Sequence, residues 1–89
     1  MITEADKKTI HKISEKYGIK SVLLFGSCVE SDKTGNDIDI AVEGLAPRDF
    51  FSFYADLLFS LSKPVDIVDL SVKSKFTRQI LQEGVLIYG

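Results

Sequence analysis

Two aspartates one residue apart are the residues of this sequence best suited to chemistry. Asp37 and Asp39 alternate with Ile38 and Ile40 in the run DIDIAV, and residues i and i+2 of a strand lie on the same face. About 5 Å apart, at an effective dielectric constant near 20, two such carboxylates repel each other by about 3 kcal/mol. Two explanations fit: a solvated strand face on which water screens the pair, or a divalent cation held by both carboxylates.

A cation site requires further ligands, and the run VDIVDL at 65–70 offers two. Mg²⁺ prefers carboxylate oxygens and completes its shell with water and substrate phosphates. A third carboxylate would complete a two-metal site that stabilises the attacking and leaving oxygens of a phosphoryl displacement. Asp66 and Asp69 are three residues apart on the predicted strand and therefore face opposite ways. At most one of them joins the site, and the other is a polar strand end.

Gly26 and Ser27 follow directly after the apolar run SVLLF. A glycine at a strand-to-helix turn lets the backbone approach a phosphate closely, and the following N–H groups and the Ser27 hydroxyl can donate to it. A plain turn is the alternative, because the sequence contains no Walker-type G-x-x-x-x-G-K-[ST] motif. Only the aspartates that follow favour phosphate binding by this pair over a plain turn.

Periodicity and turn residues predict the elements that position these groups. They are a helix from Thr3 to Gly18, a strand at 21–25, one or two helical turns at 27–32, a strand at 37–43, a helix from Pro47 to about Ser62, a strand at 65–70, a helix capped by Ser71 that ends at Gly84, and an edge strand at 85–88. This order predicts an α/β (α+β) domain with a single mixed β-sheet of about four strands flanked by helices.

Composition narrows the class of protein. The 89 residues, 45% hydrophobic and 27% charged, predict one globular domain spanning 1–89. A net charge of −2 argues against a broad basic face for long nucleic acid. No apolar run approaches a membrane span or a signal peptide, and Cys28, the only cysteine, excludes an internal disulfide. We therefore expect a cytoplasmic protein with no membrane contact.

The predicted helix at 47–62 has an unusually wide apolar surface. Its apolar side chains span roughly 200°, whereas a core-facing stripe is about 100–150° wide. Phe59 lies furthest round, next to Arg48 and Ser52. Part of this helix is predicted to face another protein, with a homo-oligomer as one possibility, and a broad, well-buried helix is the alternative.

Together, Gly26-Ser27, nine further residues, D-I-D and a later strand aspartate resemble the minimal nucleotidyltransferases of the polymerase-β-like superfamily. The resemblance covers nearly the whole chain and implies that superfamily's fold. It also implies Mg²⁺-dependent transfer of a nucleoside monophosphate from a nucleoside triphosphate. By the same resemblance Asp37 and Asp39 hold metal, Asp66 is the third catalytic carboxylate, and Gly26 and Ser27 bind the triphosphate.

The resemblance extends to a partner. Members of this branch are often encoded beside a HEPN-domain toxin, which implies transfer of AMP from ATP to a hydroxyl side chain of that toxin. The chain would then be an antitoxin that acts by adenylylation. At 89 residues it has no room for a second domain to bind the acceptor, so we expect a partner protein to supply it.

The sequence departs from the family pattern after Gly-Ser. The family commonly has Arg and then Gly where this chain has Glu30 and Ser31, and an acid beside the triphosphate should weaken nucleotide binding. Two rivals stay open: an inactive or weakly active homologue that neutralises its partner by binding alone, and a nucleotide-binding sensor. Lys73, Lys75 and Arg78 either contact phosphate or a partner, or form a solvated helix face.

Overall fold

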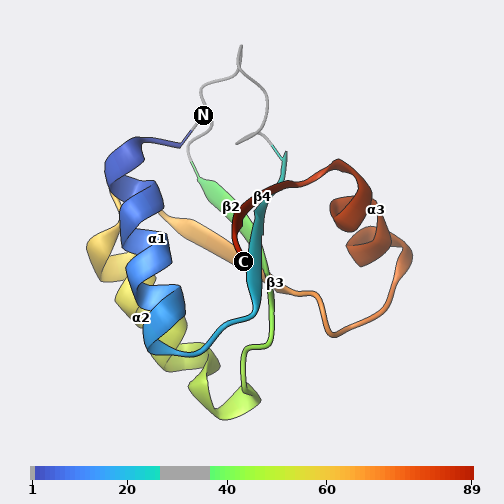
Figure 1. The fold of residues 1–89 in the computed structure, drawn as a ribbon, viewed down its shortest axis with the longest axis horizontal. Coiled ribbons are helices and arrows are strands. Elements are labelled where there is room, and N and C mark those ends of the chain that lie inside the picture. The colour runs from blue at the N-terminus through green and yellow to red at the C-terminus, as the bar shows by residue number, and fades with distance from the viewer. Residues whose placement is uncertain (1, 27–36) are drawn as a thin grey trace.

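A four-stranded mixed sheet is the centre of the fold. The computed structural model describes residues 2–26 and 37–89. Their elements are α1 (Glu4–Lys16), β1 (Ser21–Leu24), β2 (Ile38–Glu43), the 3₁₀ turn η2 (Pro47–Asp49), α2 (Phe50–Ser60), β3 (Val65–Asp69), α3 (Lys75–Glu83) and β4 (Val85–Tyr88). The strand order is β3–β2–β1–β4; β1 is antiparallel to β2 and β4, and β2 is parallel to β3 (Figure 1). The predicted α/β (α+β) fold with one mixed sheet is confirmed.

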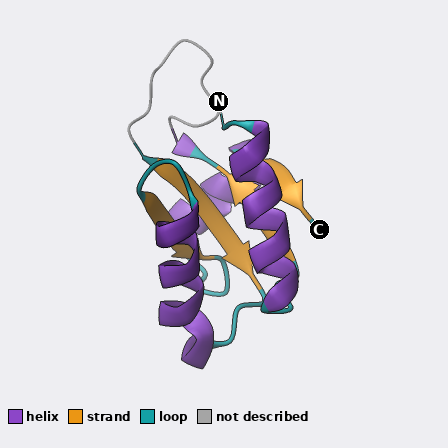
Figure 2. Cartoon of the chain, turned by 90° about the vertical axis from the view of Figure 1, so that its left-hand side faces the viewer, coloured by secondary structure: helices purple, strands orange, loops and turns teal. Residues whose placement is uncertain are grey.

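The two faces of the sheet are covered unequally. α1 and α2 lie side by side on one face, and α3 lies on the other (Figures 1 and 2). The larger core fills the space under α1 and α2 and includes Ile10, Ile40 and Phe53, all fully buried. The smaller cluster on the α3 face contains Leu23, Ala41, Leu70 and Ile80. Successive residues of β2 therefore point alternately to the two clusters.

Polar contacts join α1 to the region of α2 at both ends. The buried carboxylate of Asp6 accepts hydrogen bonds from the backbone N–H and the hydroxyl of Ser62. At the other end the Tyr17 hydroxyl donates to Asp56 Oδ2 at 2.7 Å, and Lys16 forms an ion pair with the same oxygen at 3.0 Å. Because buried polar groups are costly unless hydrogen-bonded, the Asp6 contacts help to specify how the two helices pack.

The last helix begins later than predicted. Ser74, not Ser71, is its N-cap: Ser74 Oγ accepts from the Thr77 N–H at 3.2 Å, and Thr77 Oγ1 accepts from the Ser74 N–H at 2.9 Å. The N–H of Ser71 donates instead to Asp69 Oδ1, in the turn after β3. The predicted cap was wrong because a reciprocal capping box competes better for the helix start than an isolated serine.

Other boundaries differ only slightly from prediction. The expected helix at 47–62 consists of the turn η2, with Pro47 in its first position, followed by α2, which ends at Ser60. β2 begins at Ile38, one residue after the predicted strand start. The helical turns predicted at 27–32 lie outside the described residues.

α2 presents apolar side chains on both its inner and outer faces. Phe53 and Leu57 are fully buried, whereas Phe51 is 81% exposed and Phe59 is 88% exposed. The outward position predicted for Phe59 is confirmed. In the described ranges none of the helices is long and apolar enough to cross a membrane. Exposed apolar patches are common at interaction sites, so this outer face of α2 is a candidate contact surface.

Candidate active site

Three carboxylates lie near one another at the start of β2 and β3. Asp39, the second residue of β2, pairs in the parallel register with Asp66, the second residue of β3. Paired residues project from the same face of a sheet. Asp39 lies two residues before Ala41, a member of the cluster on the α3 face, so both side chains lie on that face. Asp37, just before β2, is close enough for its charge to act on Asp39.

The environment raises the pKa of the Asp39 carboxyl. Partial burial is the largest cause, followed by the negative charges of Asp66 and Asp37 and a side-chain hydrogen bond with Asp66. A carboxylate that loses water and faces two more negative charges is destabilised in its ionised form. The arrangement therefore favours either a proton or a cation beside Asp39.

The chemistry of these groups fits Mg²⁺. All three offer carboxylate oxygens, and Mg²⁺ is usually held by one or two carboxylates together with water and substrate phosphates. Within residues 2–26 and 37–89, no three His, Cys, Asp or Glu side chains are already grouped to hold a metal ion on their own. Any cation held beside Asp39 would therefore need further ligands from water or a triphosphate.

Gly26 makes room for Asp39. Its φ is +68°, a conformation that residues with a Cβ rarely adopt, and a Cβ at this position would lie 2.5 Å from Asp39 Oδ2. The backbone conformation therefore favours glycine, and a Cβ at this position would have to displace the Asp39 carboxylate. The turn after β1 therefore packs closely against the Asp39 carboxylate of β2.

Gly26→Ala should disturb Asp39 specifically, and Gly18→Ala provides a matched control. Gly18 has a φ of +65°, but a Cβ there would meet nothing within 4 Å. Gly18→Ala should therefore cost only the left-handed backbone strain, roughly 1–2 kcal/mol. Gly26→Ala should lower the melting temperature further and change the NMR titration of the Asp39 carboxyl, which Gly18→Ala should leave unaltered. Equal effects of the two substitutions would show that the contact with Asp39 is unimportant.

Phe25 also belongs to the site, although sequence reasoning did not single it out. Its backbone N–H donates to the Asp39 carbonyl oxygen at 3.1 Å, so the two residues are neighbours across β1 and β2. Its ring lies edge-on to that of Phe76 in α3, with centroids 5.8 Å apart. The available signal was the strand alternation, which places Phe25 on the same face as Leu23.

Only some of the remaining residues predicted for the site lie in the part of the chain that the structure describes. Ser27, Glu30 and Ser31 lie outside the described residues. Asp69 pairs in register with Val42, and its Oδ1 accepts the Ser71 N–H at 2.9 Å. It therefore serves as a polar strand end, and Asp66 is the acid of β3 that lies beside Asp39.

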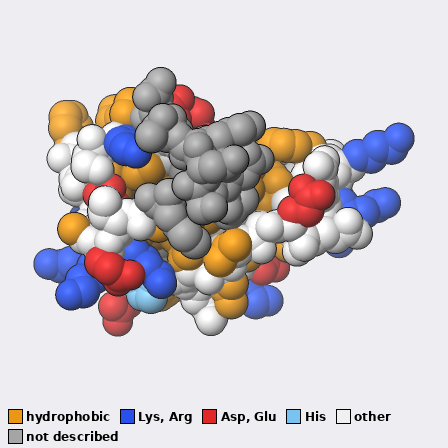
Figure 3. Space-filling view, turned by 90° about the horizontal axis from the view of Figure 1, so that it is seen from above, with side chains coloured by type: hydrophobic (Ala, Val, Ile, Leu, Met, Phe, Trp, Pro, Cys, Tyr) orange, Lys and Arg blue, Asp and Glu red, His pale blue; other side chains and the backbone are white. Residues whose placement is uncertain are grey.

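The basic residues of α3 and the turn before it stay outside the carboxylate group. Lys73 and Arg78 line a shallow pocket of about 270 Å³ with Leu70, Ser74, Thr77 and Leu81. Lys75 is exposed at the start of α3. On the face shown in Figure 3, lysine and arginine side chains lie in separate places and do not form one continuous basic surface. A role for these three residues in phosphate binding stays a prediction.

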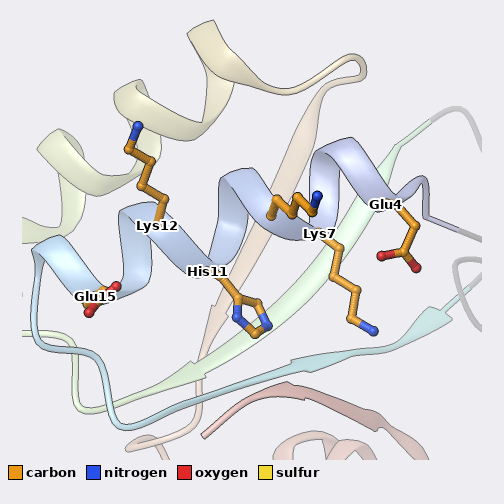
Figure 4. A pocket seen from close by; sticks show the side chains of 6 residues that line it. Glu4, Lys7, His11, Lys12 and Glu15 are labelled. Atoms are coloured by element: carbon orange, nitrogen blue, oxygen red, sulfur yellow. The ribbon is translucent and has the colours of Figure 1, made fainter.

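A second pocket, of about 330 Å³, follows the exposed side of α1. Its lining residues are Glu4, Lys7, Lys8, His11, Lys12 and Glu15. Figure 4 shows Lys7 and His11 pointing toward the strands and Lys12 pointing toward α2, so these side chains do not converge on one point. His11 Nε2 is hydrogen-bonded to the Ile87 carbonyl oxygen, and its ring meets Tyr88 edge-on. These contacts give His11 a structural role in fastening β4 to α1.

Comparison with known proteins gives two matches that cover most of the chain. The family model described as polymerase beta, nucleotidyltransferase matches residues 7–89. A candidate protein adenylyltransferase from Methanocaldococcus jannaschii is 35% identical over 81 residues, covering 85% of this chain and 82% of that protein.

Two solved structures with similar folds are toxin–antitoxin complexes. One, a toxin–antitoxin with AMP-PNP, has a TM-score of 0.77 and 28% identity, covering 93% of this chain and 73% of that chain. The other contains a tri-AMPylated Shewanella oneidensis HEPN toxin in complex with MNT antitoxin. It has a TM-score of 0.72 and 27% identity, covering 94% of this chain and 70% of that chain.

Proposed function

We propose, starting from the fact that this chain belongs to the polymerase β nucleotidyltransferase family, that it transfers AMP from ATP to a hydroxyl group of a partner protein. The observation that carries the proposal is the register of β2 and β3, which sets Asp66 beside Asp39 on one face of the sheet. The raised pKa of Asp39 supports it, because a carboxylate crowded by two others is suited to bind a cation. Gly26, built against Asp39, supplies a turn at which a triphosphate can approach the backbone.

Each residue has a distinct task in this mechanism. Asp37 and Asp39 would hold Mg²⁺ together with the triphosphate, and Asp66 would complete the set of carboxylates on the side of the acceptor. When bound, Mg²⁺ would neutralise the charge that develops on the attacking and leaving oxygens. Asp66 accepts the proton of the acceptor hydroxyl while the hydroxyl oxygen bonds to the α-phosphorus. The bond from the α-phosphorus to the oxygen bridging to the β-phosphate breaks, and pyrophosphate leaves. Gly26 and Ser27 orient the triphosphate for this displacement.

The partner we propose is a HEPN-type toxin, so that the chain acts as an antitoxin by AMPylation. Support comes from the solved relatives, one a toxin–antitoxin with AMP-PNP and one an MNT antitoxin with a tri-AMPylated HEPN toxin. The outer face of α2, with Phe51 and Phe59 more than four-fifths exposed, offers a surface for such a partner.

The same exposed face supports a second candidate function, neutralisation by contact alone. In that case the carboxylates would no longer have a catalytic role, and Glu30 and Ser31 would reflect the loss of nucleotide binding. The two functions differ in one outcome, which is whether the partner acquires a covalent nucleotide.

A labelling experiment tests the proposal. The chain is incubated with Mg²⁺, ATP labelled at the α-phosphate and a HEPN-type partner protein, and the partner is analysed by gel and mass spectrometry. We expect labelled AMP on a hydroxyl side chain of the partner, and no label when a chelator is present. A partner that binds stably but stays unlabelled would favour contact-only neutralisation.

Phe59→Lys tests the contact surface on α2. Truncation of a central aromatic in an interface typically costs 2 kcal/mol or more, so partner binding, or self-association, should weaken about thirtyfold or more. The melting temperature should hardly change, because Phe59 is 88% exposed. Gln82→Lys, at an exposed position of α3 on the other face of the sheet, adds the same charge away from α2 and is the control. Calorimetry and sedimentation provide the measurements, and unaltered binding by folded Phe59→Lys would move the interface elsewhere.

A further inference from the structure

A row of three side chains crosses the α3 face of the sheet at the level of the carboxylates. Asp66 in β3 is the register partner of Asp39 in β2. On the other side of Asp39, the next residue in the row is Phe25, whose N–H donates to the Asp39 carbonyl oxygen at 3.1 Å. Neighbouring strands are about 4.8 Å apart, so an aromatic ring stands one strand away from the central carboxylate.

Phe76 extends this row away from the carboxylates. Its ring lies at 83° to that of Phe25, with centroids 5.8 Å apart. Phe25 is half-buried against the cluster that includes Leu23 and Ile80, so much of its ring surface is already occupied. Phe76, in contrast, is 53% exposed. The pair therefore offers an aromatic surface beside the carboxylates, and Phe76 contributes most of the accessible ring.

We infer that Phe76, supported by Phe25, is a nucleobase-contacting residue of this enzyme. The inference rests on the proposed function. In the proposed reaction the acceptor approaches Asp66, at the β3 end of the row. The triphosphate lies at the other end, by Gly26, which directly follows Phe25 after β1. A nucleoside attached to that triphosphate and turned away from the acceptor extends over β1 toward α3, where Phe76 lies.

The substrate class follows from the chemistry of this contact. Every nucleobase has a π face, so stacking on an aromatic side chain tolerates different bases. A two-ring purine covers more of an exposed phenylalanine than a one-ring pyrimidine does. The described part of the site therefore points to a nucleoside triphosphate that is bound through ring stacking as well as through phosphate.

The experiment compares two ligands that share the triphosphate, one with a nucleoside and one without. Isothermal titration calorimetry measures the affinities of Mg²⁺-ATP and Mg²⁺-tripolyphosphate for the wild type, Phe76→Leu and Leu81→Ala. Phe76→Leu keeps an apolar side chain against Phe25 but removes the flat ring. Leu81→Ala is the control, because Leu81 is a similarly exposed apolar residue of α3, at 60%. Thermal melts show that each variant is folded.

Four results are expected. Wild type binds Mg²⁺-ATP more tightly than Mg²⁺-tripolyphosphate, Phe76→Leu weakens Mg²⁺-ATP binding at least about fivefold, and tripolyphosphate binding stays the same in all three proteins. Leu81→Ala should match the wild type for both ligands.

Other outcomes overturn the inference in distinguishable ways. Mg²⁺-ATP binding by Phe76→Leu as tight as by the wild type would exclude a base contact at Phe76 while leaving the proposed transferase intact. Equal losses in Phe76→Leu and Leu81→Ala would show that Phe76 only helps to fasten α3 to the sheet. Failure of the wild type to bind either ligand would overturn the proposed nucleotide site, and this inference with it.

Discussion

Asp39→Asn is expected to lower the rate of nucleotide transfer at least about a hundredfold, because it removes the carboxylate that lies between the other two. Even residues that only support metal ligands typically change activity 10- to 100-fold, and a direct ligand should matter more. Asp37→Asn and Asp66→Asn should cause losses of the same order. Initial rates of AMP incorporation into the partner, measured with saturating Mg²⁺ and ATP, provide the test.

Asp69→Asn is the matched control for these substitutions. Asp69 is on the same strand as Asp66, but its Oδ1 accepts the Ser71 N–H at 2.9 Å, and an asparagine oxygen can accept the same hydrogen bond. This variant should retain most of the activity. Equal losses from Asp66→Asn and Asp69→Asn would contradict the choice of third carboxylate. Normal transfer by the Asp37 variant would end the metal hypothesis.

A strong dependence of stability on Mg²⁺-ATP is the second large effect expected. A ligand specific to the folded state at about one hundred times its dissociation constant adds roughly 2.7 kcal/mol to the free energy of unfolding. Each kcal/mol shifts the melting temperature of a domain this size by about 4–8 °C, so the rise at saturation is on the order of 10–20 °C. Mg²⁺-ATP should act more strongly than either alone, because Mg²⁺ shares its ligands between protein and phosphates.

Asp39→Asn serves as the comparison in these melts. Without metal it should melt at a higher temperature than the wild type, because it removes the cost of partly burying a charge and the repulsion from Asp66 and Asp37, which together raise the Asp39 pKa. It should respond little when Mg²⁺-ATP is added. A wild-type melt that is indifferent to chelator, Mg²⁺ and Mg²⁺-ATP would favour neutralisation by contact alone. A metal-free variant less stable than the wild type would give Asp39 a structural role.

The difference in melting temperature between Asp39→Asn and the wild type should depend on pH. Because the pKa of Asp39 is raised above its ordinary value of 3.8, the folded state holds more protons than the unfolded state just above that pH. The contribution of Asp39 to the free energy of unfolding therefore falls as pH rises through this window. In metal-free buffer, the excess melting temperature of Asp39→Asn over the wild type should grow as pH rises from about 4.

The sequence by itself determined the features that depend on near neighbours in the chain. Strand alternation predicted that Asp37 and Asp39 share one face. It also placed Asp66 and Asp69 on opposite faces, which excluded a joint role for these two residues. Turn residues and periodicity also predicted the four strands and the outward position of Phe59. These features follow from the period of a strand or helix, which involves only a few consecutive residues.

The tertiary structure decided which distant residues meet. The parallel register of β2 and β3 brings Asp66 beside Asp39, and the antiparallel register of β1 and β2 puts Phe25 on its other side. The need for glycine at position 26 becomes specific only with Asp39 Oδ2 in place. Ser74 caps α3 because Thr77 completes a capping box there, whereas the N–H of Ser71 is bound by Asp69. Register depends on how segments far apart in the chain pack together, and no local pattern contains that information.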